Sequence, residues 1–100
     1  MKYFVIEGIF AENLPKGAAF EAEIKAHVEY LETSIDSGTI LLMGPKTESG
    51  GGFFFMKGED KQDIQDFCDN DPMFKSGTQW YKITEFRLTD CQDPLKYWFR

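Results

Sequence analysis

Histidine is the side chain best suited to proton transfer at neutral pH, because a free imidazole titrates near pH ~6.5. This chain has a single histidine, His27. Apolar residues recur around it at helical spacing, at Phe20, Ile24, Val28, Leu31 and Ile35. His27 follows Ile24 by three positions and precedes Leu31 by four, so on a helix it belongs to the apolar stripe and faces inward. Two interpretations stay open: a histidine packed in the core, or a general base beside a pocket.

Other chemistry is less well supported. Cys68 has no basic neighbour in the sequence to lower the pKa of its thiol, and the serines lack a GxSxG motif. Cys68, Cys91 and one histidine do not complete a usual zinc site, and the glycine-rich segment matches no phosphate-binding loop. The acidic residues Glu59, Asp60 and Asp63 are interpreted as a capped, solvated helix start. We therefore expect no metal and no cofactor.

Composition limits the partners. The 100 residues carry a net charge of -6, which disfavours phosphate backbones and anionic membrane surfaces. We expect no nucleic-acid partner and no membrane partner. The short amino-terminal apolar run is broken by Glu7 and lacks a small-residue cleavage site, so we do not expect a signal peptide. Two thiols without a disulfide pattern suggest a cytoplasmic protein. Ten phenylalanines are a generous apolar supply for one small domain and give a first indication of an oligomer.

The elements that must position His27 follow from hydrophobic patterning. Four strands are expected, at 2–10, 39–43, 53–56 and 79–88, and a helix from 20 to about 37 that ends at a left-handed Gly38. A second helix should be capped by Asp60, bury Ile64, Phe67 and Cys68, and stop at Asp71 because Pro72 follows. The three aromatic residues at 97–99 suggest that the tail packs on something. We expect one domain over 1–100, with its core at about 2–88 and a tail at 89–100.

The resulting order is β-α-β-β-α-β. This is the ferredoxin-like α+β pattern, a four-stranded antiparallel sheet with both helices on one face. The first three strands are apolar on both faces, with Tyr3 and Val5 opposite to Phe4 and Ile6. Two helices cover only one face, so the other needs a cover, and we infer a homodimer with two sheets face to face, a dimeric α+β barrel. Phe53, Phe55, Trp80 and Tyr81 are assigned to the core or this interface, and secondarily to a ring-binding wall.

Four motifs in register give the chain a resemblance to a known family. They are His27-x-x-x-Leu31, Gly38-x-x-Leu41-Leu42-x-Gly44-Pro45, a glycine hairpin, and Asp71-Pro72-Met73-Phe74-x-x-Gly77. This set resembles the YCII-related (YciI-like) family of small dimeric α+β barrel proteins, over about residues 2–88. Two departures are Met73, inserted before the aromatic residue that more often follows Asp-Pro directly, and Ser76-Gly77 in place of Ala-Gly.

The resemblance implies an active site made of a histidine and an aspartate, which maps onto His27 and Asp71. It also implies isomerase, lyase or dehydrochlorinase-like chemistry, without a cofactor, on a small cyclic or carbonyl-bearing metabolite. A carboxylate on one ring nitrogen would fix the tautomer, so that the other nitrogen serves as a general base. We further expect Gly44, Pro45 and Phe74 to contact the substrate.

Three alternatives remain at this stage. Asp71 could instead cap backbone amides at a helix-ending turn. The domain could be a non-catalytic module that binds a ligand or a protein. It could also be a haem-binding or cofactor-free monooxygenase, with His27 as axial ligand in the haem case.

Overall fold

The protein is described by a computed structural model that covers residues 1–100, and it has the expected α+β order. Strand β1 (Lys2–Phe10) leads to helix α1 (Ala18–Ser37), which is followed by β2 (Ile40–Pro45) and β3 (Gly52–Gly58). Helices α2 (Lys61–Asp69) and α3 (Pro72–Lys75) precede β4 (Gln79–Phe86), and a short 3-10 turn, η1 (Asp93–Leu95), lies in the tail. The strands form one antiparallel sheet in the order β2-β3-β1-β4. The ferredoxin-like fold class is therefore confirmed.

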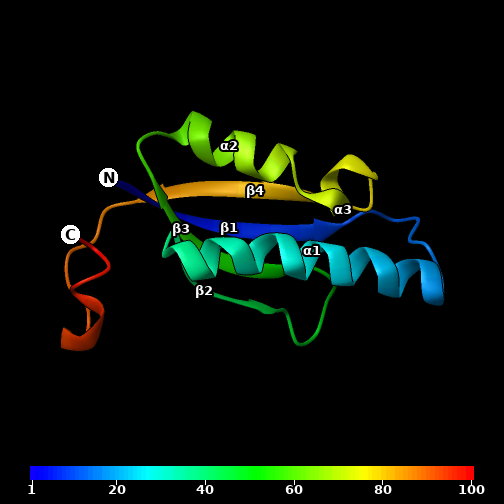
Figure 1. Ribbon diagram of the computed structural model, residues 1–100, viewed down its shortest axis with the longest axis horizontal. Helices are drawn as coiled ribbons and strands as arrows, with labels where there is room; N and C mark the ends of the chain where they lie inside the picture. Colours follow the sequence, from blue (N-terminus) through cyan, green and yellow to red (C-terminus); the bar gives the residue numbers. More distant parts are fainter.

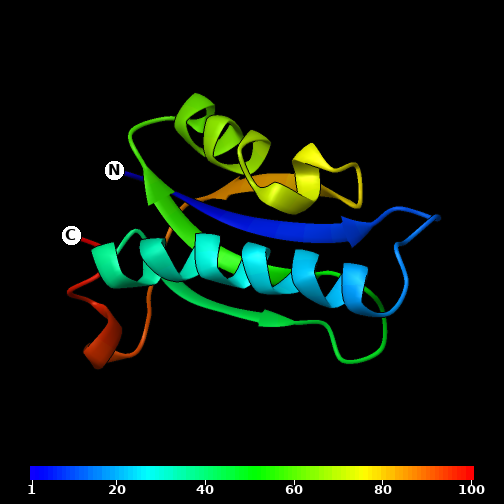
Figure 2. The ribbon, with the colours of Figure 1, turned by 45° about the vertical axis from the view of Figure 1, so that its right-hand side comes forward.

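Both long helices lie on the same face of the sheet (Figures 1 and 2). Alternate residues of the central strands point to that face and form the core with residues of the helices. The fully enclosed core side chains are Phe4, Ile6 and Ile64, and Leu31, Ile40, Phe54, Met56 and Cys68 complete the cluster. Phe4 and Ile6 thus share one face, as the alternation predicts, and in the structure it is the face that the helices cover. Ile35 is 36% exposed, and Ser34 takes the buried position in the last turn of α1.

The ends of the elements agree with their sequence signals at two helix termini. Gly38 ends α1 in the left-handed conformation, with φ 85°. Asp60 caps α2, because its Oδ1 accepts a hydrogen bond of 3.0 Å from the Asp63 amide.

Several boundaries differ from expectation. Helix α1 begins at Ala18 and not at Phe20, and β3 spans Gly52–Gly58 and not 53–56. Strand β2 continues through Pro45 because it is an edge strand that pairs with β3 as far as Gly52. Strand β4 ends at Phe86, since its ladder with β1 stops where Phe86 pairs with Tyr3. Helix α2 ends at Asp69, and the separate turn α3, which the sequence analysis missed, begins at Pro72, a residue suited to the first position of a helix.

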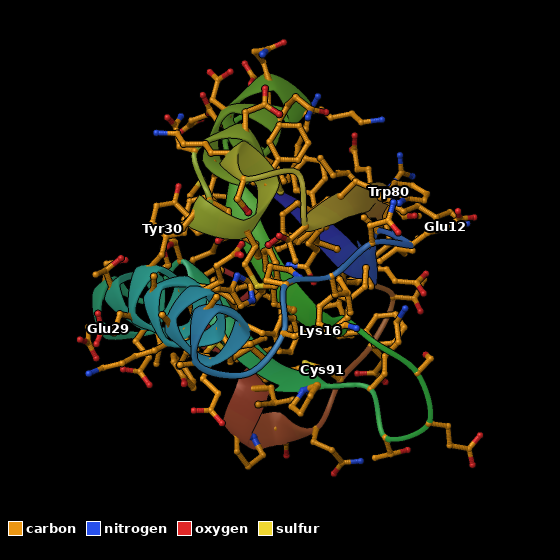
Figure 3. The ribbon with its side chains drawn as sticks, turned by 90° about the vertical axis from the view of Figure 1, so that its right-hand side faces the viewer. Glu12, Lys16, Glu29, Tyr30, Trp80 and Cys91 are labelled. Carbon is orange, nitrogen blue, oxygen red and sulfur yellow. The ribbon has the colours of Figure 1, made fainter.

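The face of the sheet that the helices leave open carries apolar side chains. Leu42, Phe53 and Trp80 are between 43% and 50% exposed there, and Val5 and Phe55 are partly exposed between them. Figure 3 shows Trp80 on the side of the molecule away from α1. Among these side chains lies an ion pair, Glu7 Oε2 to Lys46 Nζ at 2.7 Å. We call this set the open sheet face.

The C-terminal tail packs against one end of the sheet, as expected from its aromatic residues. It turns back beside the first residues of β1 (Figures 1 and 2), where Trp98 is 4% exposed. The Trp98 indole donates a hydrogen bond of 2.8 Å to the Gly38 carbonyl, and Lys57 Nζ donates one of 2.8 Å to the Trp98 carbonyl. Tyr3 donates its hydroxyl to the Phe99 carbonyl at 2.6 Å.

Candidate active site

His27 and Asp71 lie side by side although 44 positions separate them in the sequence. Nδ1 of His27 and Oδ1 of Asp71 are 2.8 Å apart. The Asp71 residue is fully buried, and the His27 side chain is 16% exposed. His27 comes from the middle of α1, and Asp71 from the link between α2 and α3. The resemblance implied this pairing, whereas sequence spacing alone gave no reason for it.

The backbone around Asp71 explains how its carboxylate becomes free to bind side chains. The Asp71 amide donates to the Cys68 carbonyl at 3.1 Å, and the Asp71 carbonyl accepts from the Lys75 amide at 3.0 Å. Pro72 occupies the first position of α3, where a missing amide proton costs nothing. Asp71 makes no side-chain cap to this turn. The alternative of an ordinary capping aspartate is therefore wrong, because both carboxylate oxygens are bound to side chains.

Tyr81 and Gln79 extend the hydrogen-bond chain, and the sequence analysis missed both roles. Tyr81 donates its hydroxyl to Asp71 Oδ2 at 2.6 Å, and Gln79 Nε2 donates to the Tyr81 oxygen at 3.0 Å. Both residues are on β4, two positions apart, so they share the face that meets the helices. The available signal was a glutamine on the same strand face as Tyr81 and Ile83. We call His27, Asp71, Tyr81 and Gln79 the polar chain.

Burial and the neighbouring carboxylate keep the hydroxyl and thiol groups around Asp71 protonated. Desolvation raises the pKa of Tyr81 far above its ordinary value, and the hydrogen bond to Asp71 raises it further. Burial, with the charge of Asp71, raises the pKa of the Cys68 thiol to about 12 and that of Tyr30 to about 12. Tyr81 is thus held as a hydrogen-bond donor, and Cys68 is a poor nucleophile.

The donors and acceptors fix the tautomer of His27. An ionised carboxylate only accepts hydrogen bonds, so Nδ1 must carry the proton that Asp71 Oδ1 receives. In the neutral imidazole, Nε2 then carries the lone pair. Every buried side-chain nitrogen or oxygen has a hydrogen-bond partner. Nε2 has no hydrogen-bond partner in the chain. Nε2 is therefore reachable from outside the core, with its lone pair available to take a proton.

A cavity of about 340 Å³ has His27 in its wall. It is bounded by α1, by the hairpin between β2 and β3, and by the ends of β1 and β4. Its walls are mostly apolar, and the lining residues are Gly8, Phe10, Ile24, His27, Val28, Leu31, Met43, Gly44, Pro45, Gly51, Gly52, Phe53, Phe54, Gln79 and Tyr81. Gly44 and Pro45 line this cavity, as expected of substrate-contacting residues. Phe74 does not line it and is 37% exposed, so the structure places this expected contact outside the cavity.

The glycine hairpin reaches the cavity because its backbone packs closely against β1. Gly51 has φ 86°, in the left-handed region, and a Cβ there would collide with the carbonyl oxygen of Gly8. The sequence analysis identified this segment only as a glycine hairpin. In the structure it is a fitted wall of the cavity, and the fit requires glycine.

Glu23, one turn before His27 on α1, ties the Asp71 segment to the helix. Its Oε1 accepts a hydrogen bond of 2.7 Å from Thr78 Oγ1 and another from Ser76 Oγ. Ser76 is one of the two departures from the family pattern, and an alanine there could not make this bond. The hydroxyl thus helps to hold α3 against α1 beside the polar chain.

No group of three or more His, Cys, Asp or Glu side chains is arranged to hold a metal ion. None of the helices has the length and apolar character that crossing a bilayer requires.

Comparison with known proteins gives a family and a fold. A family model described as "YCII-related domain" matches residues 1–87. A comparison with curated proteins found no match. The solved structures similar to this chain include 5-chloro-2-hydroxyhydroquinone dehydrochlorinase (TftG) from Burkholderia phenoliruptrix in complex with 2,5-dihydroxybenzoquinone, with 21% identity, a TM-score of 0.65, and coverage of 85% of this chain and 93% of that chain. An antibiotic biosynthesis monooxygenase follows, with 12% identity, a TM-score of 0.56, and coverage of 90% of this chain and 100% of that chain. At these identities the structural likeness shows a shared fold.

Proposed function

The chain belongs to the YCII-related domain family, and from this starting point we propose that it is a small-molecule enzyme in which His27 is the general base and Asp71 its orienting partner. The observation that carries the proposal is the state of the two imidazole nitrogens. Nδ1 is 2.8 Å from a fully buried carboxylate, Nε2 has no partner in the chain, and His27 lines an apolar cavity. The carboxylate also stabilises the imidazolium that forms when Nε2 takes a proton.

The reaction class is proton abstraction next to a carbonyl or enol, leading to isomerisation or elimination. The apolar cavity suits one small ring, because apolar walls bury its faces and a few polar groups orient it. The dehydrochlorinase of the same fold acts on a chlorinated hydroxyhydroquinone, and we take this class as the first substrate to test. The proposed reaction needs no cofactor, since a histidine with this support moves a proton by itself. We place the protein in the cytoplasm, supported by its two free cysteines.

We also propose that the working form is a homodimer joined through the open sheet face. A contiguous apolar surface of this kind is an aggregation hazard on a monomer. Leu42, Phe53 and Trp80 are the most exposed of its side chains, and Lys46 neutralises Glu7 among them. A second copy of the same face would bury these side chains in a symmetric contact. The tail already covers the end of the sheet at Tyr3, so the contact would use the rest of the face.

The test of the catalytic proposal is chloride release from 5-chloro-2-hydroxyhydroquinone, followed for the unaltered chain, His27→Ala and His27→Gln. If His27 is the base, both variants lose turnover by on the order of 10²-fold or more, because Gln cannot take a proton. Circular dichroism and sedimentation show whether each variant keeps its fold and assembly. Unchanged turnover in a folded His27→Ala variant would exclude the proposed role.

The same variants separate the enzyme from a non-catalytic binding module. That alternative is favoured by one observation, the predominance of apolar side chains in the cavity, which serves binding whether or not chemistry follows. In a binding module, His27→Gln retains ligand affinity, and the unaltered chain leaves every bound ligand unchanged. A ligand that is converted by the unaltered chain, and bound but not converted by His27→Gln, decides for the enzyme.

A further inference from the structure

We propose that Gln79 is a specificity residue whose Oε1 accepts a hydrogen bond from the substrate, so that the cavity selects uncharged rings carrying hydroxyl groups. The inference rests on the proposed function in that it takes the cavity beside His27 as the substrate site. It adds a second polar contact and the chemical class of ligand that this contact selects.

The orientation of the Gln79 amide follows from the buried carboxylate, one hydrogen bond at a time. Asp71 accepts at Oδ2, so the Tyr81 hydroxyl must donate its only proton there. The Tyr81 oxygen can then only accept from Gln79, which obliges the amide to turn its NH₂ group toward Tyr81, at 3.0 Å. Oε1 is left pointing the other way. The choice between the two amide orientations is thus set by Asp71, two hydrogen bonds away.

Oε1 of Gln79 is open to the cavity although the residue is 3% exposed. Gln79 lines the cavity, and its Oε1 has no hydrogen-bond partner in the chain. Every buried side-chain nitrogen or oxygen has such a partner, so Oε1 must be among the atoms that remain accessible. A ligand that fills the cavity would cut this oxygen off from water, and the oxygen would then be left unpaired at a cost unless the ligand supplies a donor. A ligand hydroxyl would supply the missing hydrogen bond.

Gly8 gives the Gln79 amide its room. A Cβ added at Gly8 would lie 2.5 Å from Oε1 and 2.9 Å from the amide carbon. Gly8 sits in the middle of β1 and also lines the cavity. Any larger residue there would therefore push the amide out of its place.

The accessible polar atoms of the cavity wall select the ligand by its donors. Neutral His27 offers the lone pair of Nε2, and Gln79 offers Oε1, so both are acceptors. The Tyr81 hydroxyl is already used in both directions. No Lys, Arg, Asp or Glu side chain lines the cavity, which leaves a carboxylate or phosphate without a counter-charge. The best match is a neutral ring with two hydroxyl groups.

The experiment measures binding, by calorimetry under anaerobic conditions, of the three dihydroxybenzene isomers and of the dimethyl ether of each. These probes need no turnover. For at least one isomer, the unaltered chain should bind the diol more tightly than its ether by about threefold or more. Gln79→Met should reduce that ratio by about two- to tenfold, the effect of one neutral hydrogen bond.

Two variants support the interpretation of Gln79→Met. Gly8→Ala leaves the glutamine in the chain but displaces its Oε1, so it should reduce the ratio in the same way even if Gln79→Met folds poorly. Gln62→Met is the matched control, because Gln62 is an exposed glutamine of α2 bound to Asp66 and does not line the cavity. It should leave the ratio unchanged.

Three results would overturn the assignment of Gln79. They are a ratio unchanged in folded Gln79→Met and Gly8→Ala, an equal loss of affinity for diol and ether, and no binding of any isomer by the unaltered chain at millimolar concentration. None of these bears on whether turnover depends on His27. Conversely, turnover that survives in His27→Ala would exclude His27 as the base. The ratio of diol to ether affinity does not depend on that result.

Discussion

Tyr81 donates its hydroxyl proton to the Asp71 oxygen that His27 does not use, at a distance of 2.6 Å. The buried carboxylate therefore has a donor on each oxygen, one from α1 and one from β4. With both oxygens bound, the carboxylate has no freedom to turn away from the imidazole. Tyr81 is thus a positioning residue for His27, acting through Asp71.

Tyr81→Phe should lower kcat by about tenfold, because the imidazole loses its fixed partner, and it should also raise KM, because the Gln79 amide loses the acceptor that orients it. The variant should also lose about 1–3 kcal/mol of stability, since one buried carboxylate oxygen is left without a donor. Steady-state kinetics and urea unfolding measure the two effects.

Tyr30→Phe is the control for that variant. Tyr30 also donates a partly buried hydroxyl, at 2.7 Å, but to the backbone carbonyl of Phe67. Its removal should reduce stability while kcat stays unchanged. An equal fall of kcat in the two variants would contradict the positioning role of Tyr81.

The protein should lose stability as the pH rises from about 9 to 12. The pKa of the Cys68 thiol is raised from 9.0 to about 12 in the folded chain, and that of Tyr30 from 10.0 to about 12. Above pH 9 the unfolded chain therefore releases protons that the folded chain retains, which favours unfolding. The pKa of Tyr81 is raised as well, so it acts in the same direction.

Urea unfolding at intervals between pH 8 and 11 measures this effect. Each group contributes a slope of at most about 1.4 kcal/mol per pH unit while it is deprotonated only in the unfolded chain. Cys68→Ala should reduce the fall in the free energy of unfolding that begins near pH 9. A free energy of unfolding that stays level or rises over this range would show that these groups are not buried as described.

Trp80→Glu should convert the proposed homodimer into monomers. A carboxylate placed in the open sheet face would be buried without a partner on each side of the symmetric contact. Sedimentation velocity at micromolar concentration distinguishes the two states. Tyr97→Glu is the matched control, because Tyr97 is an aromatic residue of the tail that is 65% exposed. If the unaltered chain itself sediments as a monomer, the homodimer is excluded.

Trp98→Ala should destabilise the domain by about 3–5 kcal/mol, as expected when a buried tryptophan is removed. The indole packs 5.8 Å from the Tyr3 ring and 4.8 Å below the Lys57 ammonium, and its loss leaves the Gly38 carbonyl without this donor. Thermal unfolding followed by circular dichroism measures the change. A stability equal to that of the unaltered chain would mean that the tail does not hold the end of the sheet.

Hydrophobic patterning predicted much of the fold because periodicity reports which face a residue takes. The alternation of Phe4 and Ile6 with Tyr3 and Val5, and the stripe around His27, each predicted a face that the structure shows. The turn α3 was missed because it has only four residues, which is too short for a helical periodicity to be recognised in the sequence.

The polar chain needed information that patterning does not contain. The meeting of His27 with Asp71 depends on how three elements pack, and it was available only through the family resemblance. Period-two alternation puts Gln79 and Tyr81 on one face but gives no hydrogen-bond partner to either. The expected contact of Phe74 with the substrate also depended on packing, and the structure places this residue outside the cavity.

The tautomer of His27 is the most direct test of the account. As the chain has one histidine, its two ring nitrogens give the only imidazole signals in a long-range ¹H–¹⁵N spectrum. At a pH where the imidazole is neutral, the proton should reside on Nδ1 and Nε2 should show the shift of an unprotonated nitrogen. A neutral imidazole with its proton on Nε2 would contradict the hydrogen bond to Asp71 and, with it, the proposed general base.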